Sequence, residues 1–244
     1  GGEQAPVYTY KISARSSAET QLLIYKLMPR KMFVHHAKAI LMSERTVKRG
    51  IRDILNFTEL MPDARSSVPL LIADGPLEEV MRTFTPLERN PAESIESRLK
   101  LLYEYALLSG RRIEMRDVIE RSARRDIAVI PMIAPTPRTG NPNSWQVNAE
   151  IDANINQLEV GGGAVIRDYR MVGRLSDGEL VLYNLLNGAK GRFVRLVPFR
   201  DGHLSVSMNS RGAKKKLEWR NGKPFVRARI RVDISTIAMS EYHP

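Results

Sequence analysis

Residues 33–73 of the chain read FVHHAKAILMSERTVKRGIRDILNFTELMPDARSSVPLLIA. The short apolar run Ala37–Met42 predicts a buried strand, because a helix start follows it directly. Ser43 can cap that helix, and its apolar face is formed by Val47, Ile51, Ile54 and Leu55. The run Val68–Ala73 predicts a second buried strand, in which Pro69 favours an edge position or an irregular start. A strand, a helix and a strand of these lengths indicate a βαβ-like unit.

Two blocks of the sequence match one known pattern. The positions of the first block are Phe33, His36, the strand Ala39–Met42, Glu44, Gly50 with Ile51, Phe57, Asp63 and Arg65. Those of the second are Gly163-Ala164-Val165, Val172-Gly173-Arg174-Leu175-Ser176 and Glu179. Together they resemble the Ger(x)C family of spore germination proteins, the lipoprotein C subunits of nutrient germinant receptors. The chain departs from the pattern at Leu60 and Met61, where the family often has an Arg-Asp pair, so no role of that pair carries over.

Composition excludes several kinds of site. The 244 residues include no cysteine, which rules out disulfides, thiolate metal sites and cysteine nucleophiles within them. The four histidines are scattered, and the adjacent His35 and His36 would point to opposite faces of a strand, so we expect no metal site and no cofactor. The net charge of +11 favours a polyanionic neighbour, which can be nucleic acid, an anionic membrane or an acidic protein.

The ends of the chain and its hydropathy bear on location. No run approaches the roughly twenty apolar residues of a membrane helix, so the chain as given is expected to be soluble. The opening GGEQAP suggests a trimmed start. The family resemblance implies an upstream signal sequence and lipid-bearing cysteine, and therefore a lipid anchor at the outer face of the inner spore membrane.

The first predicted domain covers residues 1–88. It adds to the βαβ-like unit a strand at Val7–Ile12, a helix from Ser16 or Ser17 to Pro29, and a last helix that begins at Pro76. This last helix is expected to bury Leu77, Val80, Met81 and Phe84. The proline-containing segment PLERNP, residues 86–91, predicts the domain boundary.

The second predicted domain covers residues 89–244. Its helices are expected from Asn90 to Gly110, from Met115 to about Arg124, and from the capping box Ser176-Asp-Gly-Glu179 to Gly188. The long helix carries an apolar stripe of Ile95, Leu99, Leu102 and Ala106. A strand at Asp126–Ala134, a long loop at residues 135–156 and a hairpin of residues 163–167 and 169–175 complete this part. The family continues into a further C-terminal domain, which we expect to be absent from this chain.

The last part of the sequence predicts an antiparallel meander. Its strands are expected at Phe193–Phe199, His203–Met208, Lys214–Arg220 and Phe225–Ile234, with Asn221-Gly222 as a type I′ turn. Six cations are then expected on one surface across this turn, namely Lys214, Lys216, Arg220, Arg227, Arg229 and Arg231, interrupted by Glu218. They either protect the solvent side of a one-sided sheet or contact anionic headgroups or an acidic subunit. Trp219 and Phe225 are expected on the opposite, apolar face.

No catalytic residues are predicted. The triglycine Gly161–Gly163 enters a strand and lacks a following Lys-Ser/Thr, so a turn is favoured over a phosphate site. A GxSxG motif is absent, and the carboxylate pairs Glu78 with Glu79 and Glu150 with Asp152 are interpreted as solvated charges. His36 is interpreted as a structural, hydrogen-bonded histidine.

We therefore predict a mixed α/β, or α+β, fold of two domains, each a sheet with packed helices, the second ending in an antiparallel meander. The resemblance implies a non-enzymatic docking or scaffold subunit of a spore nutrient germinant receptor, with the membrane-embedded A and B subunits as partners. The alternative is a basic nucleic-acid-binding module, supported by the charge. No nucleic acid is expected, because no known reading motif is present.

Overall fold

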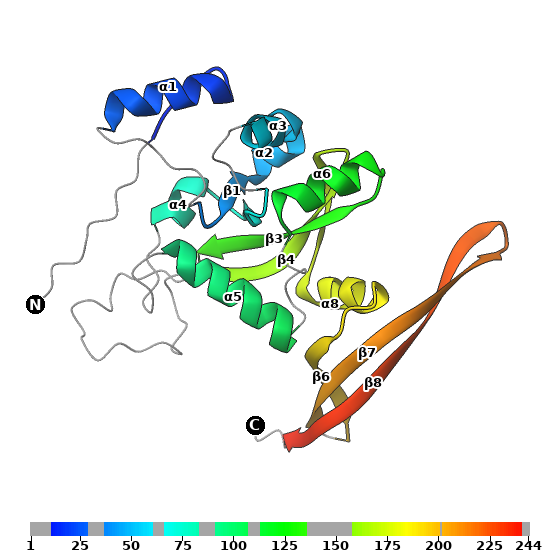
Figure 1. The fold of residues 1–244 in the computed structure, drawn as a ribbon. Helices are drawn as coiled ribbons and strands as arrows, with labels where there is room; N and C mark the ends of the chain where they lie inside the picture. The colour runs from blue at the N-terminus through cyan, green and yellow to red at the C-terminus, as the bar shows by residue number, and fades with distance from the viewer. Residues whose placement is uncertain are drawn as a thin grey trace, which may run out of the picture. The chain divides into compact units, whose positions relative to one another are not determined.

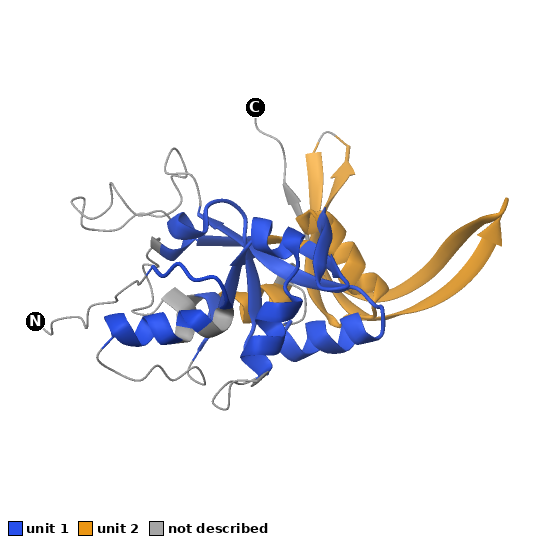
Figure 2. Cartoon of the chain, turned by 90° about the horizontal axis from the view of Figure 1, so that it is seen from above, with its two compact units in different colours: residues 1–97, 113–160, 164–174 blue, residues 98–112, 161–163, 175–244 orange. Residues whose placement is uncertain are grey.

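The computed structural model describes residues 11–28, 37–60, 66–82, 91–106, 113–135, 158–200 and 202–240. The chain divides into two compact units, coloured separately in Figure 2. Unit 1 comprises residues 1–97, 113–160 and 164–174, and unit 2 comprises residues 98–112, 161–163 and 175–244. The domain boundary expected at residues 88–89 lies outside the described residues, so the domains 1–88 and 89–244 stay a prediction.

The first sheet holds five strands among the described residues, in the order β1-β2-β3-β4-β5. These strands are β1 (Ile40–Ser43), β2 (Leu70–Ala73), β3 (Ala128–Pro135), β4 (Leu158–Arg167) and β5 (Arg170–Leu175). Figure 1 labels β1, β3 and β4 of this sheet. β1 runs parallel to β2 and β2 runs parallel to β3, with Ile40 opposite Leu70 and Ile72 opposite Met132. The predicted βαβ unit is thereby confirmed, as are both of its strands.

β2 is the buried centre of the parallel part of this sheet. All four of its residues are buried, and because alternate residues point to opposite faces, both faces of the strand are covered. Pro69 begins the strand irregularly, through an isolated antiparallel bridge to Glu114. An edge position is wrong for Pro69, since β2 lies between β1 and β3.

The helix predicted after Ser43 is divided into two helices, α2 (Glu44–Arg49) and α3 (Arg52–Leu60). The Ser43 hydroxyl caps α2 by accepting a hydrogen bond from the Thr46 N–H at 3.2 Å. Gly50 ends the helix with a φ of 122°, which L residues with a side chain rarely adopt. One continuous helix was therefore the wrong prediction, because an amphipathic pattern does not reveal a backbone break at glycine.

The break lets the chain dock on the turn between β4 and β5. The Ile51 N–H donates to the carbonyl oxygen of Tyr169 at 2.9 Å, and the Arg52 guanidinium lies 4.7 Å from the centre of the Tyr169 ring. A Cβ on Gly50 would lie 3.4 Å from Nε of Arg170. Gly50 and Ile51 of the first pattern block thus lie, inside unit 1, against the turn between the strands that carry the second block.

The main core lies where α2, α3 and α6 (Met115–Ala123) cover one face of the sheet. Its fully buried members include the predicted Val47, Ile51 and Leu55, whereas Ile54 is partly buried and packs against the cluster. On the side of the sheet, the core is formed by alternate residues of the strands: Leu70, Ile72, Ala128, Ile130, Met132, Ala164 and Ile166. Burial of these side chains is the main source of stability of unit 1.

Helices α1, α4 and α5 lie close to the positions predicted for them. α1 (Ser17–Leu27) contacts α3, and α4 (Leu77–Arg82) contacts β1 and β3. Val80 is buried as expected, but Met81 is 51% exposed, so its predicted burial is wrong, and Phe84 lies outside the described residues. α5 (Pro91–Ala106) buries Ile95 and Leu99. The strand expected at Val7–Ile12 and the loop expected at residues 135–156 lie almost wholly outside the described residues.

Unit 2 contains α8 (Asp177–Leu186) and an antiparallel sheet of β6 (Gly191–Phe199), β7 (Gly202–Arg220) and β8 (Lys223–Ser240). The predicted capping box is present, since the Ser176 N–H donates to Oε2 of Glu179 at 2.8 Å and the Glu179 N–H donates back to Ser176 Oγ at 3.4 Å. α8 packs on the sheet through a small apolar cluster built on Val181, Leu185 and Phe193, against which Tyr103, Met208 and Ile230 also pack.

The meander is confirmed, with one correction. The strands expected at His203–Met208 and Lys214–Arg220 are a single strand, β7, because bulges between Ser207 and Met208 and between Ser210 and Gly212 absorb the irregular stretch. The predicted fold class, sheets with packed helices and a final antiparallel meander, is confirmed.

Candidate interaction surface

β7 and β8 continue together beyond β6 as a two-stranded ribbon, as Figure 1 shows. β6 pairs with β7 only from Gly202 to Ser210, whereas the β7–β8 pairing extends to Arg220 opposite Lys223. We call residues 211–220 and 223–231 the ribbon. Asn221 and Gly222 connect its strands with φ values of 48° and 72°, which confirms the predicted type I′ turn.

The register places the six predicted cations on one face of the ribbon. Lys214 lies opposite Arg229, and Lys216 lies opposite Arg227. Arg231 and Arg220 fall on the same face, and Lys223, opposite Arg220, is a seventh cation that the sequence prediction missed. We call this the basic face, formed by Lys214, Lys216, Arg220, Lys223, Arg227, Arg229 and Arg231, all of which are exposed.

Charges of like sign stand directly opposite each other on the basic face, which is unfavourable in an antiparallel pair. Glu218 compensates only part of this charge, through ion pairs at 3.5 Å to Arg220 and 3.4 Å to Arg227. Within the described residues, Lys214, Lys216 and Arg229 form no ion pair with an acidic side chain. The face can therefore take up an anionic surface without first breaking ion pairs at these positions.

The opposite face of the ribbon is mostly apolar, but it also carries the exposed Lys215, which lies opposite Ala228 and donates to Oδ1 of Asn187 at 3.2 Å. At the end near α8 it is covered, because Ile230 packs against the cluster built on Val181 and Leu185. Toward the turn it is open, with Leu217 62%, Trp219 69% and Val226 53% exposed.

Phe225 does not lie where the sequence prediction put it. It is opposite Glu218 and therefore on the basic face, where the Arg220 guanidinium lies 4.2 Å from its ring centre. Counting back from the two-residue turn would have found this position, because such a turn sets Arg220 opposite Lys223 and Glu218 opposite Phe225.

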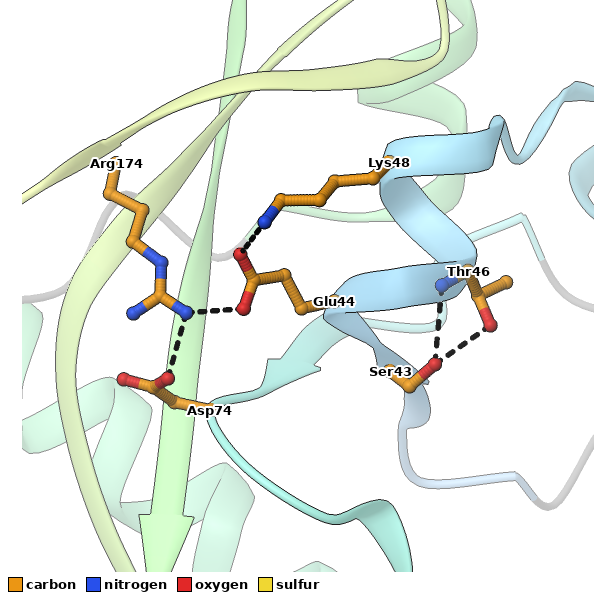
Figure 3. A network of polar contacts seen from close by, with 6 residues as sticks. All are labelled: Ser43, Glu44, Thr46, Lys48, Asp74 and Arg174. Carbon is orange, nitrogen blue, oxygen red and sulfur yellow. Dashed lines mark hydrogen bonds and ion pairs between the residues drawn. The ribbon is translucent and has the colours of Figure 1, made fainter.

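A second polar cluster lies in unit 1, where strands β1 and β2 end (Figure 3). Glu44 follows β1, Asp74 follows β2, and Arg174 of β5 forms an ion pair with both, at 2.9 Å to Asp74. Nζ of Lys48 lies 2.6 Å from the Glu44 carboxylate. Hydrogen bonds from Lys48 and Arg174 lower the pKa of Glu44. Since each carboxylate of this cluster is paired, the arrangement is typical of a structural clamp between three strands.

Arg174→Gln is expected to lower the free energy of unfolding by about 1 kcal/mol or less at neutral pH. Because the pKa of Glu44 is lowered in the folded state, its charge stabilises the fold above the ordinary pKa of 4.5, and this contribution is lost as the pH falls through the lowered pKa. The variant should therefore lose less stability on acidification than the parent. Urea unfolding followed by circular dichroism at neutral and acidic pH measures both effects.

Arg167→Gln serves as the control for this prediction, since it removes an exposed arginine of neighbouring β4. It should leave both the stability and its pH dependence unchanged. If both variants and the parent showed the same pH dependence of the free energy of unfolding, the ion pairs of Arg174 would contribute nothing to it.

The triglycine binds a side chain of its own chain. The Gly162 N–H donates to Oδ1 of Asp177 at 2.6 Å, and a Cβ on Gly161 would lie 3.3 Å from the same oxygen. The backbone donor that a phosphate would need is thus occupied. The turn predicted for the triglycine is wrong, since its three residues lie within strand β4.

Gly162→Ala is expected to destabilise unit 2 by about 1–3 kcal/mol. Gly162 has a φ of +64°, and a Cβ there would lie 2.7 Å from the carbonyl oxygen of Leu175, a backbone atom that cannot move aside cheaply. Thermal unfolding measures the loss. Gly173→Ala is the matched control, since a Cβ there meets nothing within 4 Å. Equal melting temperatures for the two variants would refute the close approach.

The other sequence candidates are placed as follows. His35, His36, Glu150 and Asp152 lie outside the described residues. Glu78, one of the paired carboxylates, forms an ion pair with Lys11. Among the described residues, no group of three or more histidine or acidic side chains is arranged to hold a metal ion. No helix in the described part of the chain is both long and apolar enough to cross a membrane.

Comparisons with known proteins identify the same family in both parts of the chain. A family model described as "Spore germination protein N-terminal domain" matches residues 1–135, and one described as "Spore germination B3/ GerAC like, C-terminal" matches residues 161–244. A solved structure described as "Crystal Structure of the GerBC protein" is similar in fold, with a TM-score of 0.60 and 16% sequence identity. The similarity covers 91% of this chain and 59% of that one, so the chain spans less than two thirds of its length. A comparison with curated proteins gave no match.

Proposed function

Because the chain belongs to the GerAC-like family of spore germination proteins, we propose that it is a subunit of a spore nutrient germinant receptor. In this role it is an ectodomain that docks with other subunits and catalyses no reaction. The observation that carries the proposal is that the two family models match in order, over residues 1–135 and 161–244. The similar fold of the GerBC protein supports it.

The proposed partners are the two membrane-embedded receptor subunits, A and B. The proposed location is the outer face of the inner spore membrane, where a lipid anchor of the natural precursor would hold the ectodomain. The exposed basic face supports a place beside a membrane, because the negative surface of an anionic bilayer attracts Lys and Arg side chains. At this location the two units would couple nutrient sensing to the release of spore contents by contact.

A deletion and complementation experiment tests this function. Spores that lack the gene should germinate more slowly with a nutrient that triggers the parent strain, and the restored gene should return the parent rate. A chain purified by an affinity tag from detergent-solubilised spore membranes should bring the A and B subunits with it. Normal germination of the deletion strain with every nutrient of a panel, together with recovery of the chain alone, would contradict the proposal.

A further inference from the structure

The end of the ribbon combines exposed apolar and basic side chains. We call residues 217–220 and 223–226 the ribbon tip. Its four large apolar side chains are all exposed: Leu217 62%, Trp219 69%, Phe225 43% and Val226 53%. Between them stand the exposed cations Arg220 and Lys223. A soluble two-stranded ribbon has no stability reason to expose a tryptophan and three further apolar residues at its end, since burying them would be favourable.

We propose that the ribbon tip is a membrane-interface anchor, which places Trp219 and its apolar neighbours among the headgroups of an anionic bilayer. This inference rests on the proposed function, which sets the chain beside a membrane. The cations of the basic face then lie along the headgroup region and bind lipid phosphates. Arg220 and Lys223 flank the inserted residues and extend their charged ends back to the headgroups.

The distribution of side chains over both faces favours a bilayer over other polyanions. Leu217, Trp219 and Val226 lie on the face opposite the basic face, whereas Phe225 lies on the basic face itself. An acidic protein or a nucleic acid bound to the basic face would leave the apolar face in water. A bilayer entered from the tip contacts both faces at once, and tryptophan with flanking cations is typical of residues at a membrane interface.

The strand pairing leaves the ribbon tip accessible to a bilayer. Because β6 pairs only with Gly202–Ser210, no strand of the described chain covers either edge of the ribbon beyond that point. The ribbon is held at the end away from its tip by the packing of Ile230 on the cluster next to α8. It is therefore anchored in unit 2 and open at its turn.

Fluorescence of Trp219 tests the proposal. The chain has two tryptophans, so Trp145→Phe leaves Trp219 as the single reporter. With vesicles of phosphatidylcholine and phosphatidylglycerol, its emission should shift to the blue and be quenched by lipids brominated near the headgroup. With phosphatidylcholine alone, or with a duplex oligonucleotide or polyglutamate, it should stay as in buffer. An unchanged emission with the anionic vesicles, whether or not the chain sediments with them, would overturn the inference, as would an equal shift with either soluble polyanion.

A substitution pair provides the second readout. Trp219→Ala should weaken binding to the anionic vesicles about tenfold or more, because transferring a large apolar side chain out of water is worth at least one factor of ten. Leu196→Ala, at a comparably exposed apolar position of β6, should bind as the parent does. Equal binding by both variants would show that the ribbon tip does not insert. These vesicle results are independent of the deletion experiment, so the anchor can fail while the receptor role stands.

Discussion

Replacing Lys214, Lys216, Arg227 and Arg229 with Gln is expected to lower the affinity of the chain for anionic vesicles by about a thousandfold. Each cation near an anionic surface contributes about 1 kcal/mol, so four of them contribute about 4 kcal/mol. These four residues form two opposing pairs at the centre of the basic face. Co-sedimentation with phosphatidylglycerol-containing vesicles measures the change. The parent should also lose affinity as salt is raised, because salt screens exposed charges.

A matched control separates the basic face from net charge. Lys190, Arg192, Arg195 and Arg200 are exposed cations on or beside β6, outside the ribbon. Changing these four to Gln removes the same formal charge but should cost much less affinity. If both quadruple variants lost affinity equally, overall charge would explain binding, and the basic face would have no special part in it.

Leu70→Ala is expected to lower the free energy of unfolding of unit 1 by about 2–5 kcal/mol. Leu70 is fully buried in the middle strand of the parallel part of the sheet and belongs to the main core. The substitution removes packing on one face of β2 and leaves a cavity. This strand also joins β1 to β3, so the surrounding backbone has little freedom to collapse into the space. Urea denaturation followed by far-ultraviolet circular dichroism measures the loss.

Leu22→Ala is the control for this prediction, since Leu22 of α1 is 62% exposed. Its effect should lie within about 0.5 kcal/mol of zero. A loss below about 1 kcal/mol for Leu70→Ala would mean that β2 is not the packed centre that its burial indicates.

Local signals were enough to predict most elements of this fold. The apolar run Val68–Ala73 predicted β2 because a parallel strand buried on both faces is continuously apolar. Ser43 and Ser176 predicted helix starts because a hydroxyl at the N-cap satisfies a backbone donor of the first turn. Such signals act within a few residues, so the sequence alone shows them.

Features that depend on the conformation of single residues or on distant contacts could not be predicted in this way. The break at Gly50 depends on a positive φ and on a hydrogen bond from Ile51 to Tyr169, far along the chain. The clamp on Arg174 requires β1, β2 and β5 to lie in one sheet. Neither the amphipathic pattern nor the charges of these segments contain that information.

The basic face could be predicted in part. Alternation predicted that Arg227, Arg229 and Arg231 share a face, and the Asn-Gly turn sets the register that adds Lys223 and Phe225. The bulge between Ser210 and Gly212, which inserts Arg211 into β7, was not predictable from the sequence pattern. The location of the surface was therefore predicted from sequence, and the register of the turn accounts for the two residues that the prediction missed or misplaced.

The most direct test of the account is nutrient-triggered germination of spores whose chain carries the Gln substitutions at Lys214, Lys216, Arg227 and Arg229. Spores with the control substitutions at Lys190, Arg192, Arg195 and Arg200 are compared with them, and immunoblots of spore membranes confirm equal amounts of both chains. We expect slower germination of the first spores and a parent rate for the second. Parent-rate germination of both would contradict the claim that this chain acts in germination through its basic face.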